Sequence, residues 1–433
     1  MYRRCETAEA CVGMRYYLSD ADGTGGRIKA IPEDFIVKEI SRYPDRHDDG
    51  RFAIAEVTSR NWETNRLVRI ISRSIGISRE KIGFAGTKDK RAVTTQLMSF
   101  EAPVESLSKV YLKDVTIENA YHSRRGVQIG DLIGNSFDIT VRDCTASANE
   151  ISPTIDSVSF QIGELGGFPN YFGVQRFGTS RPITHLVGRS IVHGNTREAV
   201  DIYLSQTSEH ELPAVTESRK LLANRSYLPE ALKTMPKTMS FERVIAEHLI
   251  KNPDDDIGAI SKLPTNLQMM FTHAYQSYLF NMMLSKRMEL NIPLDRPLEG
   301  DVVVPLDQNG TPLHERPVAV TSKNADLVEK QLRSGSALLT MSLFGSESEI
   351  ADGEIGDIER NIIKKEGIVN ENFLVTGLPH CSSKGSRREI ICPVNDIKHC
   401  LTSDGYRLEF SLPKGNYATC LLREYMKAEM TSY

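Results

Sequence analysis

The stretch GFAGTKDKRAVTTQ, residues 83–96, carries the pattern from which the fold and the chemistry of this protein can be predicted. An apolar run at 81–84 precedes the polar residues 85–91, and a second run rich in β-branched residues follows. This order predicts a strand, a loop and a second strand. The glycines in the loop would allow a ligand to approach the backbone closely.

The loop holds a single carboxylate, Asp89, next to the cations Lys88, Lys90 and Arg91. Nearby cations favour the ionised form of a carboxylate, and an ionised carboxylate can act as a nucleophile or a base. The cations could also contact phosphate groups. Taken alone, the loop sequence fits a solvated turn with a surface ion pair at least as well, because such charged loops are common.

Residues 60–91 are basic, although the chain as a whole has a formal net charge of −4. The apolar spacing predicts a helix that is capped by Thr64 or Asn65, runs to Ile75 and ends at Gly76. A basic region on an acidic protein suits one polyanion bound at one place. A solvated helix face is the alternative.

The length of 433 residues predicts two domains, because single cores rarely grow beyond roughly 250–300 residues. A strand is expected at 137–143, and a long helix is expected to be capped by Thr265 or Asn266. The character of the sequence changes near 166–169 and reverts in the last forty residues. We therefore expect one domain at 1–165 together with 394–433, and a second domain, 166–393, inserted into it.

The sequence shows no apolar stretch of about 18 residues, and its beginning lacks the apolar segment of a secretory signal, so a cytoplasmic protein is expected. The seven cysteines form no C-x-x-C pair. The nearest approach to a metal cluster matches no standard zinc spacing; it consists of His380, Cys381, Cys392, His399 and Cys400. We expect no metal site and interpret these cysteines as free thiols.

The loop around Asp89 resembles the catalytic motif of the tRNA pseudouridine synthase D (TruD) family, in its archaeal form. Other stretches similar to family motifs occur in the family's order: KAIPEDF at 29–35, GNSF at 134–137, NYFGVQRFG at 170–178 and LPKGNYAT at 412–419. One such stretch would be weak evidence. Five in order, spread over nearly the whole chain, are specific.

The resemblance implies an α/β (α+β) fold in which a catalytic domain with a mixed, mainly antiparallel sheet flanked by helices contains an inserted α/β TRUD domain. It implies an isomerase that converts a uridine of tRNA, typically at position 13 in the D arm, into pseudouridine. Such an enzyme needs no cofactor. The partner expected from the resemblance is tRNA, with no membrane and no obligatory protein partner.

The resemblance also assigns roles, with Asp89 as the essential catalytic residue and Lys29 beside it. Phe137 would stack on the target base, although it could instead be the first core residue of its strand. Asn135 would bind the base or the backbone, or only close a turn. Phe35 is ambiguous in the same way, and a surface role for Lys29 is its alternative.

A stacked uridine must be flipped out of folded tRNA at a cost of a few kcal/mol, so the enzyme also needs a basic surface for phosphates. Beside Lys88 and Arg91, the candidates for RNA contacts are Arg66, Arg69, Arg73, Arg124, Arg125, Arg176, Arg387 and Arg388.

Two other functions stay open on the residues alone. A non-catalytic protein that binds structured RNA could have lost Asp89 and Lys29, and both are present. A hydrolase with an aspartate nucleophile would need a second carboxylate about 5–10 Å away, and none lies near Asp89 in the sequence.

Overall fold

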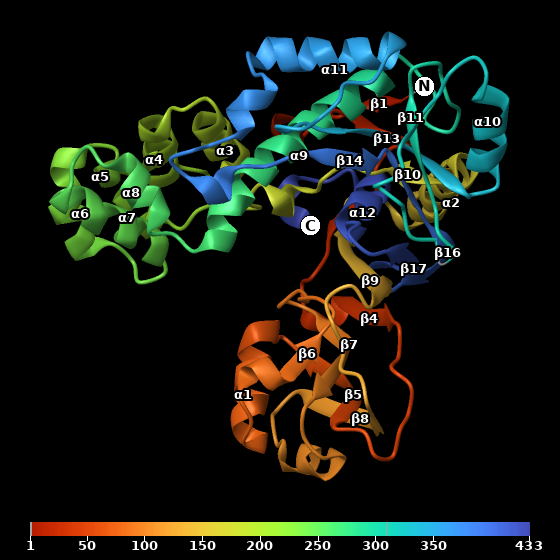
Figure 1. The fold of residues 1–433 in the computed structure, drawn as a ribbon. Coiled ribbons are helices and arrows are strands. Elements are labelled where there is room, and N and C mark those ends of the chain that lie inside the picture. Colours follow the sequence, from red (N-terminus) through yellow and green to blue (C-terminus); the bar gives the residue numbers. More distant parts are fainter. Residues whose placement is uncertain (1, 309) are drawn as a thin grey trace. The chain divides into compact units, whose positions relative to one another are not determined.

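The computed structural model describes residues 2–308 and 310–433, and the chain divides into two compact units (Figure 1). The sheet unit comprises Ala21–Phe168, Cys392–Ala428 and Ser432–Tyr433. The helical unit comprises Met1–Asp20, Pro169–Ile391 and Glu429–Thr431. Within the described residues, no helix combines the length and the apolar character needed to cross a membrane.

The sheet unit is built on a nine-stranded sheet, and only the pairing of β4 with β7 is parallel. A mixed, mainly antiparallel sheet was expected, and this expectation is confirmed. The strand order is β16 (Asn395–Thr402), β17 (Gly405–Pro413), β9 (Leu132–Cys144), β4 (Phe35–Ser41), β7 (Val93–Phe100), β5 (Phe52–Arg60) and β8 (Val115–Ser123), with β3 (Gly25–Arg27) paired to β9 and β6 (Ile82–Phe84) paired to β7.

Period-two alternation decides which side chains of the central strands face inward. Val37 on β4 and Phe410 on β17 are both cross-strand partners of Phe137 on β9, and all three are buried. Because the side chains of paired residues point to the same face of a sheet, they form one apolar row. The strand expected at 137–143 is present and is longer than predicted, since β9 begins at Leu132.

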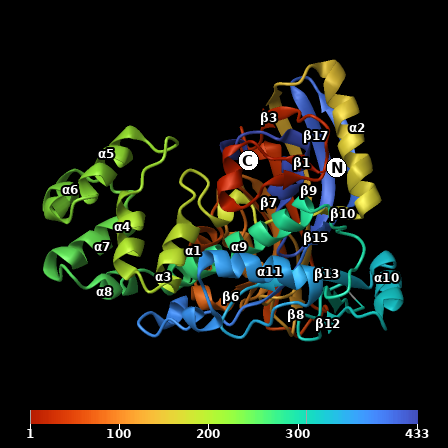
Figure 2. The same ribbon diagram turned by 90° about the horizontal axis from the view of Figure 1, so that it is seen from above.

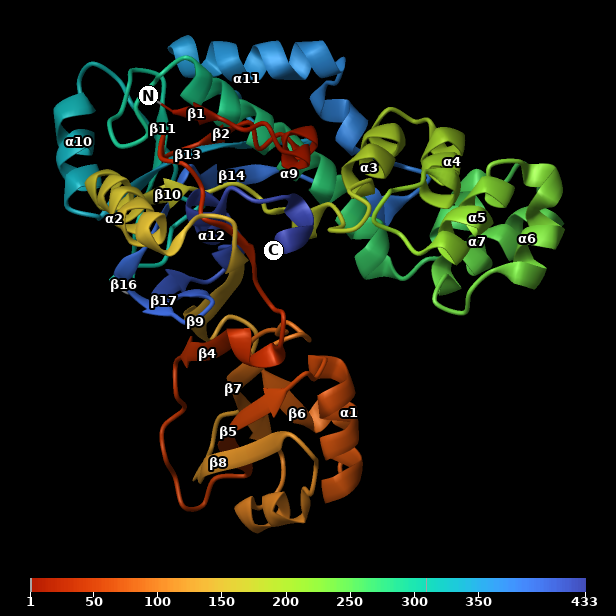
Figure 3. The same cartoon turned by 180° about the vertical axis from the view of Figure 1, so that it is seen from behind.

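Helix α1 (Thr64–Ile75) lies beside the strands of this unit (Figure 3), and its apolar side chains pack on β5 and β7. Its end at Gly76 was predicted correctly, with a φ of 74° that favours glycine. The predicted cap was wrong. The side chain of Glu63 accepts hydrogen bonds from the backbone of Asn65 and Arg66, while Thr64 is already inside the helix.

Two further helices cover another part of the sheet. Helix α2 (Ala148–Leu165) runs along β17 (Figure 2), and α12 (Ala418–Met426) packs against α2. The hydroxyls of Ser159 and Tyr425 lie 3.0 Å apart and join the two helices. The chain leaves the sheet unit near β10 (Gly167–Pro169) and returns near β15 (Ile391–Pro393), and these two short strands pair with each other.

The core of the helical unit is formed around α9 (Thr265–Glu289). Helix α3 crosses α9 so closely that a Cβ at Gly188 would lie 2.0 Å from the carbonyl oxygen of Phe271, so glycine is required there. The expected caps Thr265 and Asn266 are wrong, because Pro264 occupies the cap position. The smaller helices that precede α9 in this unit are α3 (Thr184–Val192), α4 (Thr196–Ser205), α5 (Pro213–Leu222), α6 (Leu228–Thr234), α7 (Ser240–Lys251) and α8 (Asp256–Ser261).

A four-stranded antiparallel sheet also belongs to the helical unit, and it is accompanied by α10 (Ala325–Arg333) and α11 (Gly353–Glu366). Its strand order is β12 (Val318–Ala319), β11 (Val302–Pro305), β13 (Ala337–Leu343) and β14 (Ser386–Glu389). The unit is therefore a mixture of helices and strands.

The first twenty residues belong to the helical unit, although the sequence placed them with 21–165. Their strands β1 (Arg3–Arg4) and β2 (Tyr16–Tyr17) pair with each other, and the loop between them is bonded to α9. The hydroxyl of Ser285 donates to the carbonyl of Gly13 at 2.6 Å, and the amide of Asn281 donates to the carbonyl of Val12 at 3.0 Å. These hydrogen bonds come from polar side chains of a distant helix, which the sequence pattern did not indicate.

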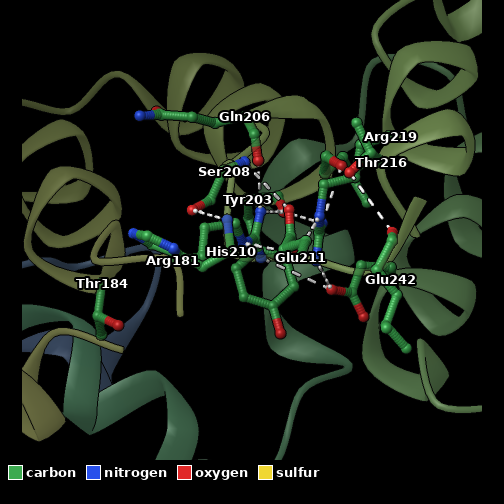
Figure 4. Close-up of polar contacts among 12 residues, drawn as sticks. Arg181, Thr184, Tyr203, Gln206, Ser208, His210, Glu211, Thr216, Arg219 and Glu242 are labelled. Atoms are coloured by element: carbon green, nitrogen blue, oxygen red, sulfur yellow. Dashed lines mark hydrogen bonds and ion pairs between the residues drawn. The ribbon is translucent and has the colours of Figure 1, made fainter. Parts of the chain in front are cut away.

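A buried network of two arginines and two glutamates joins α5, α7 and the segments beside them (Figure 4). Arg219 lies 2.9 Å from both Glu211 and Glu242, and Arg181 lies 3.7 Å from the same two carboxylates. Burial lowers the pKa of Arg181 to about 10, an effect to which the nearby Arg219 adds. Because the charges balance, we interpret the network as structural.

Candidate active site

Asp89 lies on the loop between β6 and β7 and exposes 55% of its side chain. Its Oδ2 is 3.7 Å from the Nζ of Lys29, whose side chain is only 15% exposed. The backbone of Lys29 has a φ of 56°, a left-handed conformation that residues with a Cβ rarely adopt. Such a conformation persists where the surroundings hold it, and here it accompanies the approach of the ammonium to Asp89.

A row of aromatic rings lies beside the Lys29–Asp89 pair. The Nζ of Lys29 is 4.2 Å from the ring centre of Phe35, which meets Phe137 edge-on at 6.1 Å. Phe137 in turn stacks on Phe410 at 5.3 Å. Phe35 is 1% exposed and Phe137 is 7% exposed, so both contribute to the core. The geometry places Lys29 beside both Asp89 and Phe35, and Phe35 beside Phe137.

Lys88 does not point outward with the other cations of the loop. Its side chain is 6% exposed, and its Nζ lies 2.7 Å from the Oε2 of Glu39 on β4. The same Nζ donates to the Oδ1 of Asn135 at 3.3 Å. The expectation that Lys88 is available to phosphates is therefore not met in this structure, because its ammonium is already used in a buried ion pair.

The other two cations of the loop, Lys90 and Arg91, are exposed. Arg91 donates to the backbone carbonyl of Ala30 at 3.4 Å, which places its guanidinium beside the segment that carries Lys29. Both cations remain accessible to an anionic ligand.

The loop that carries Asp89 is joined to the beginning of α1, because the backbone N–H of Lys88 donates to the hydroxyl of Thr64 at 2.9 Å. Burial alone would raise the pKa of Glu63 beside it, but the N–H groups of Asn65 and Arg66 outweigh that effect and lower it. Along α1, the arginines at 66, 69 and 73 are all exposed on one side. Among the residues that the structure describes, no carboxylate lies within 4.0 Å of Arg66, Arg69 or Arg73.

The remaining candidates for RNA contacts are engaged with other groups of the protein. Arg124 donates to Asp49 at 3.0 Å, and Arg125 pairs with Asp131. In the helical unit, Arg387 lies 3.3 Å from Glu359, while Arg388 stands over the ring of Phe172 at 4.1 Å and also bonds to Asn170. The guanidinium of Arg176 lies 5.8 Å from the same ring of Phe172. The last three arginines thus each contact another group of the helical unit.

The cysteines and histidines that were considered as metal ligands do not form a cluster. In the part of the chain that the structure describes, no group of three or more His, Cys, Asp or Glu residues is arranged to hold a metal ion. Cys381 is buried, and burial raises the pKa of its thiol to about 11.

Glu39 and Thr64 lie at the candidate site, and neither was predicted there from the sequence. A signal for Glu39 was present, since it falls on the buried positions of β4 in alternation with Phe35 and Val37. An acidic residue at an inward position requires a partner, and Lys88 is that partner. Thr64 gave no comparable signal, because it was interpreted as a helix cap.

Comparison with known proteins supports the resemblance seen in the motifs. The family model described as tRNA pseudouridine synthase D (TruD) matches residues 11–425. The chain belongs to the TruD family. Proteins of this family isomerise uridine to pseudouridine in tRNA, so it is a family of isomerases.

Relatives of this TruD-family chain are found in several archaea. A "Probable tRNA pseudouridine synthase D" of Methanosarcina acetivorans is 40% identical over 428 residues, which cover 97% of each chain. One from Halobacterium salinarum is 35% identical over 436 residues, with 98% of each chain covered. The crystal structure of a putative TruD from Methanosarcina mazei superposes with a TM-score of 0.88 at 39% identity, covering 99% of this chain and 100% of that one.

Proposed function

We propose that this protein converts a uridine of tRNA into pseudouridine and that Asp89 is its catalytic carboxylate. The observation that carries the proposal is the Lys29–Asp89 pair at 3.7 Å, beside the row formed by Phe35 and Phe137. Membership of the TruD family supports the reaction class. The position of Asp89 on an exposed loop supports its role, because a nucleotide must be able to reach it.

The reaction rearranges bonds within one nucleotide. The bond from N1 of uracil to C1′ of ribose breaks, and a bond from C5 to C1′ forms. The hydrogen on C5 leaves to solvent, and N1 ends with a proton. Asp89 either attacks C1′ or removes a proton from the ribose. Both roles require the ionised carboxylate, and the ammonium of Lys29 lies 3.7 Å from it.

The exposed arginines of α1 would hold the tRNA backbone near the loop. Arg66, Arg69 and Arg73 carry no carboxylate partner within the described residues, and the N-terminus of their helix is bonded to the loop through Thr64. Arg91 and Lys90 would extend this basic surface to the reacting nucleotide. Phe137 would stack on the base after it is flipped, an interaction worth roughly 1–3 kcal/mol.

Three finer statements belong to the same proposal. The target is the uridine at position 13 in the D arm, the reaction takes place in the cytoplasm, and residues 169–391 of the helical unit correspond to the inserted TRUD domain. The return of the chain to the sheet unit after Ile391 supports the insertion.

The experiment that tests the reaction and the residue together is release of tritium from a tRNA transcript labelled at uridine C5. Formation of the C5–C1′ bond must expel that hydrogen, so wild type should release tritium and Asp89→Asn should not. The variant keeps the size of the side chain and loses its charge. Release by the variant at the wild-type rate would show that Asp89 is the wrong residue. No release by a wild-type protein that binds the tRNA would overturn the reaction.

A further inference from the structure

Behind the exposed Asp89, its neighbour Lys88 is held inside the protein at two points. The side-chain ammonium lies 2.7 Å from Glu39, and the backbone N–H donates to Thr64 at 2.9 Å. The side chains of Lys88 and Glu39 are 6% and 1% exposed, whereas that of Asp89 is 55% exposed. One residue of the loop is therefore fixed, and the adjacent residue is presented to solvent.

The acceptors around Lys88 are themselves fixed by the sheet. Glu39 and Asn135 are cross-strand partners on β4 and β9, so their side chains lie on the same face. Asn135 accepts from the ammonium at 3.3 Å, and the hydroxyl of Ser41 donates to Glu39. The ammonium thus has one ion-pair partner and one hydrogen-bond acceptor, and the positions of both depend on strand register and not on a flexible loop.

The ion pair also lies next to the aromatic row. Val37 pairs with Phe137 in the same ladder in which Glu39 pairs with Asn135, two residues further along both strands. The ion pair between Lys88 and Glu39 therefore also holds the loop in place relative to β9, the strand that carries Phe137. A misplacement of about 1 Å at a reacting group can reduce a rate about 100-fold, so such fixing matters for catalysis.

A contribution to the stability of the fold does not by itself explain why the Lys88–Glu39 ion pair is buried beside Asp89. Apolar residues of similar volume often serve a core as well as a buried ion pair, because both charges must be desolvated. A buried pair can, however, select one conformation out of several. The loop beside a catalytic carboxylate is a place where such selection has an effect.

We propose that the Lys88–Glu39 ion pair, together with the hydrogen bond from Lys88 to Asn135, positions the loop so that Asp89 meets the target nucleotide, and that Lys88 does not contact tRNA phosphates. The proposal rests on the function proposed above. Lys88 and Glu39 are positioning residues in this scheme, because they act through Asp89 and the loop.

The test separates binding from chemistry in four variants of the full-length protein. Glu39→Gln, Lys88→Met and the double variant carrying both changes are compared with Lys109→Met, a control at an exposed lysine of the same unit outside the loop. Single-turnover tritium release from C5-labelled tRNA gives the rate, and titration of the same tRNA at several salt concentrations gives Kd and its salt dependence. Urea unfolding reports whether each variant is folded.

We expect Glu39→Gln and Lys88→Met each to lower the single-turnover rate about 100-fold. Their tRNA affinity should stay within about twofold of wild type, with an unchanged salt slope. The double variant, which leaves no unpaired buried charge, should regain stability but not rate. Lys109→Met should keep the rate, the stability and the salt slope of wild type.

Four results would overturn the inference. A double variant that recovers the rate together with stability would make the pair merely structural. A reduced salt slope in Lys88→Met but not in Glu39→Gln would assign Lys88 to a phosphate. A wild-type rate in Glu39→Gln would remove the positioning role while leaving the proposed function intact. A wild type that releases no tritium would overturn the proposed function itself, and the inference with it.

Discussion

Phe137 is the residue whose two interpretations the sequence left open. Its ring stacks on Phe410 at 5.3 Å with 24° between the planes, and only 7% of its surface is exposed. This packing is that of a core residue. The ring also lies in the row that begins at Lys29, beside Asp89. A core role and a role in stacking are therefore compatible, and a graded pair of substitutions can separate them.

Phe137→Leu should lower the rate of tritium release by at least about tenfold, while the free energy of unfolding falls by only on the order of 1 kcal/mol. Leucine fills most of the volume but offers no flat face to a base. Phe137→Ala should lower the free energy of unfolding by about 3–5 kcal/mol, because it also leaves a cavity. Phe100→Leu is the control, since Phe100 is fully buried on β7 and should lose stability only. Equal rates in the two leucine variants would contradict a stacking role for Phe137.

Among the elements, α1 has an apolar side that packs on the sheet and a basic side that faces solvent. Leu67 and Ile71 are fully buried against the sheet, whereas the arginines face solvent. The same helix begins next to the loop that carries Asp89, because Thr64 accepts the hydrogen bond from Lys88. Its packing therefore places a basic surface at a defined position relative to Asp89.

Removing charge from this side of α1 should weaken tRNA binding without changing the chemistry. Replacement of Arg66, Arg69 and Arg73 by alanine should reduce the salt slope of binding by about 0.9 for each phosphate that the protein no longer neutralises, with a nearly normal rate at saturating tRNA. Arg79→Ala is the matched control, because Arg79 is in the same basic region but pairs with Glu80 at 2.8 Å. A triple variant with the salt slope of wild type would exclude α1 as the tRNA-binding helix.

The sequence predicted the two sides of α1 and the strands around the loop, because periodicity depends on local geometry. It did not predict how polar groups are shared between elements. Thr64 was expected to cap its own helix, but Glu63 does so and leaves the Thr64 hydroxyl for Lys88. Lys88 was expected at the surface, but its ammonium forms a buried ion pair with Glu39, which lies 49 positions earlier. Such pairings arise from sheet register, which one sequence does not reveal.

At the scale of the whole molecule, contacts between distant segments also decide how the chain divides into its two units, and one sequence does not reveal such contacts. Residues 1–20 could not be assigned to the helical unit from their own pattern, because their anchors are side chains of α9. Arg15 donates its backbone N–H to Ser285, which lies 270 positions away. The internal change of character near 166–169, in contrast, is a local signal, and the units meet within a few residues of it.

The stability of the molecule towards acid should depend on one histidine of the helical unit. His185 on α3 is 4% exposed, stacks on Tyr278 at 5.0 Å and meets Phe177 edge-on at 5.3 Å. Burial lowers its pKa to about 4, whereas in the unfolded chain a histidine titrates near 6.5. The folded state therefore favours the neutral ring. Its contribution is complete above about pH 6.5 and is lost as the pH falls from there towards about 4.

Between pH 7 and pH 5, protonation of His185 in the unfolded chain should lower the free energy of unfolding by about 2 kcal/mol. His185→Phe keeps an aromatic ring in the stack and removes the titration, so its free energy of unfolding should fall by that much less over the same interval. Urea unfolding followed by circular dichroism at both pH values measures the difference. His380→Gln, at an exposed histidine of the same unit, should behave like wild type. Parallel pH dependence in wild type and His185→Phe would show that the buried ring is not the group responsible, because carboxylates titrate alike in both proteins.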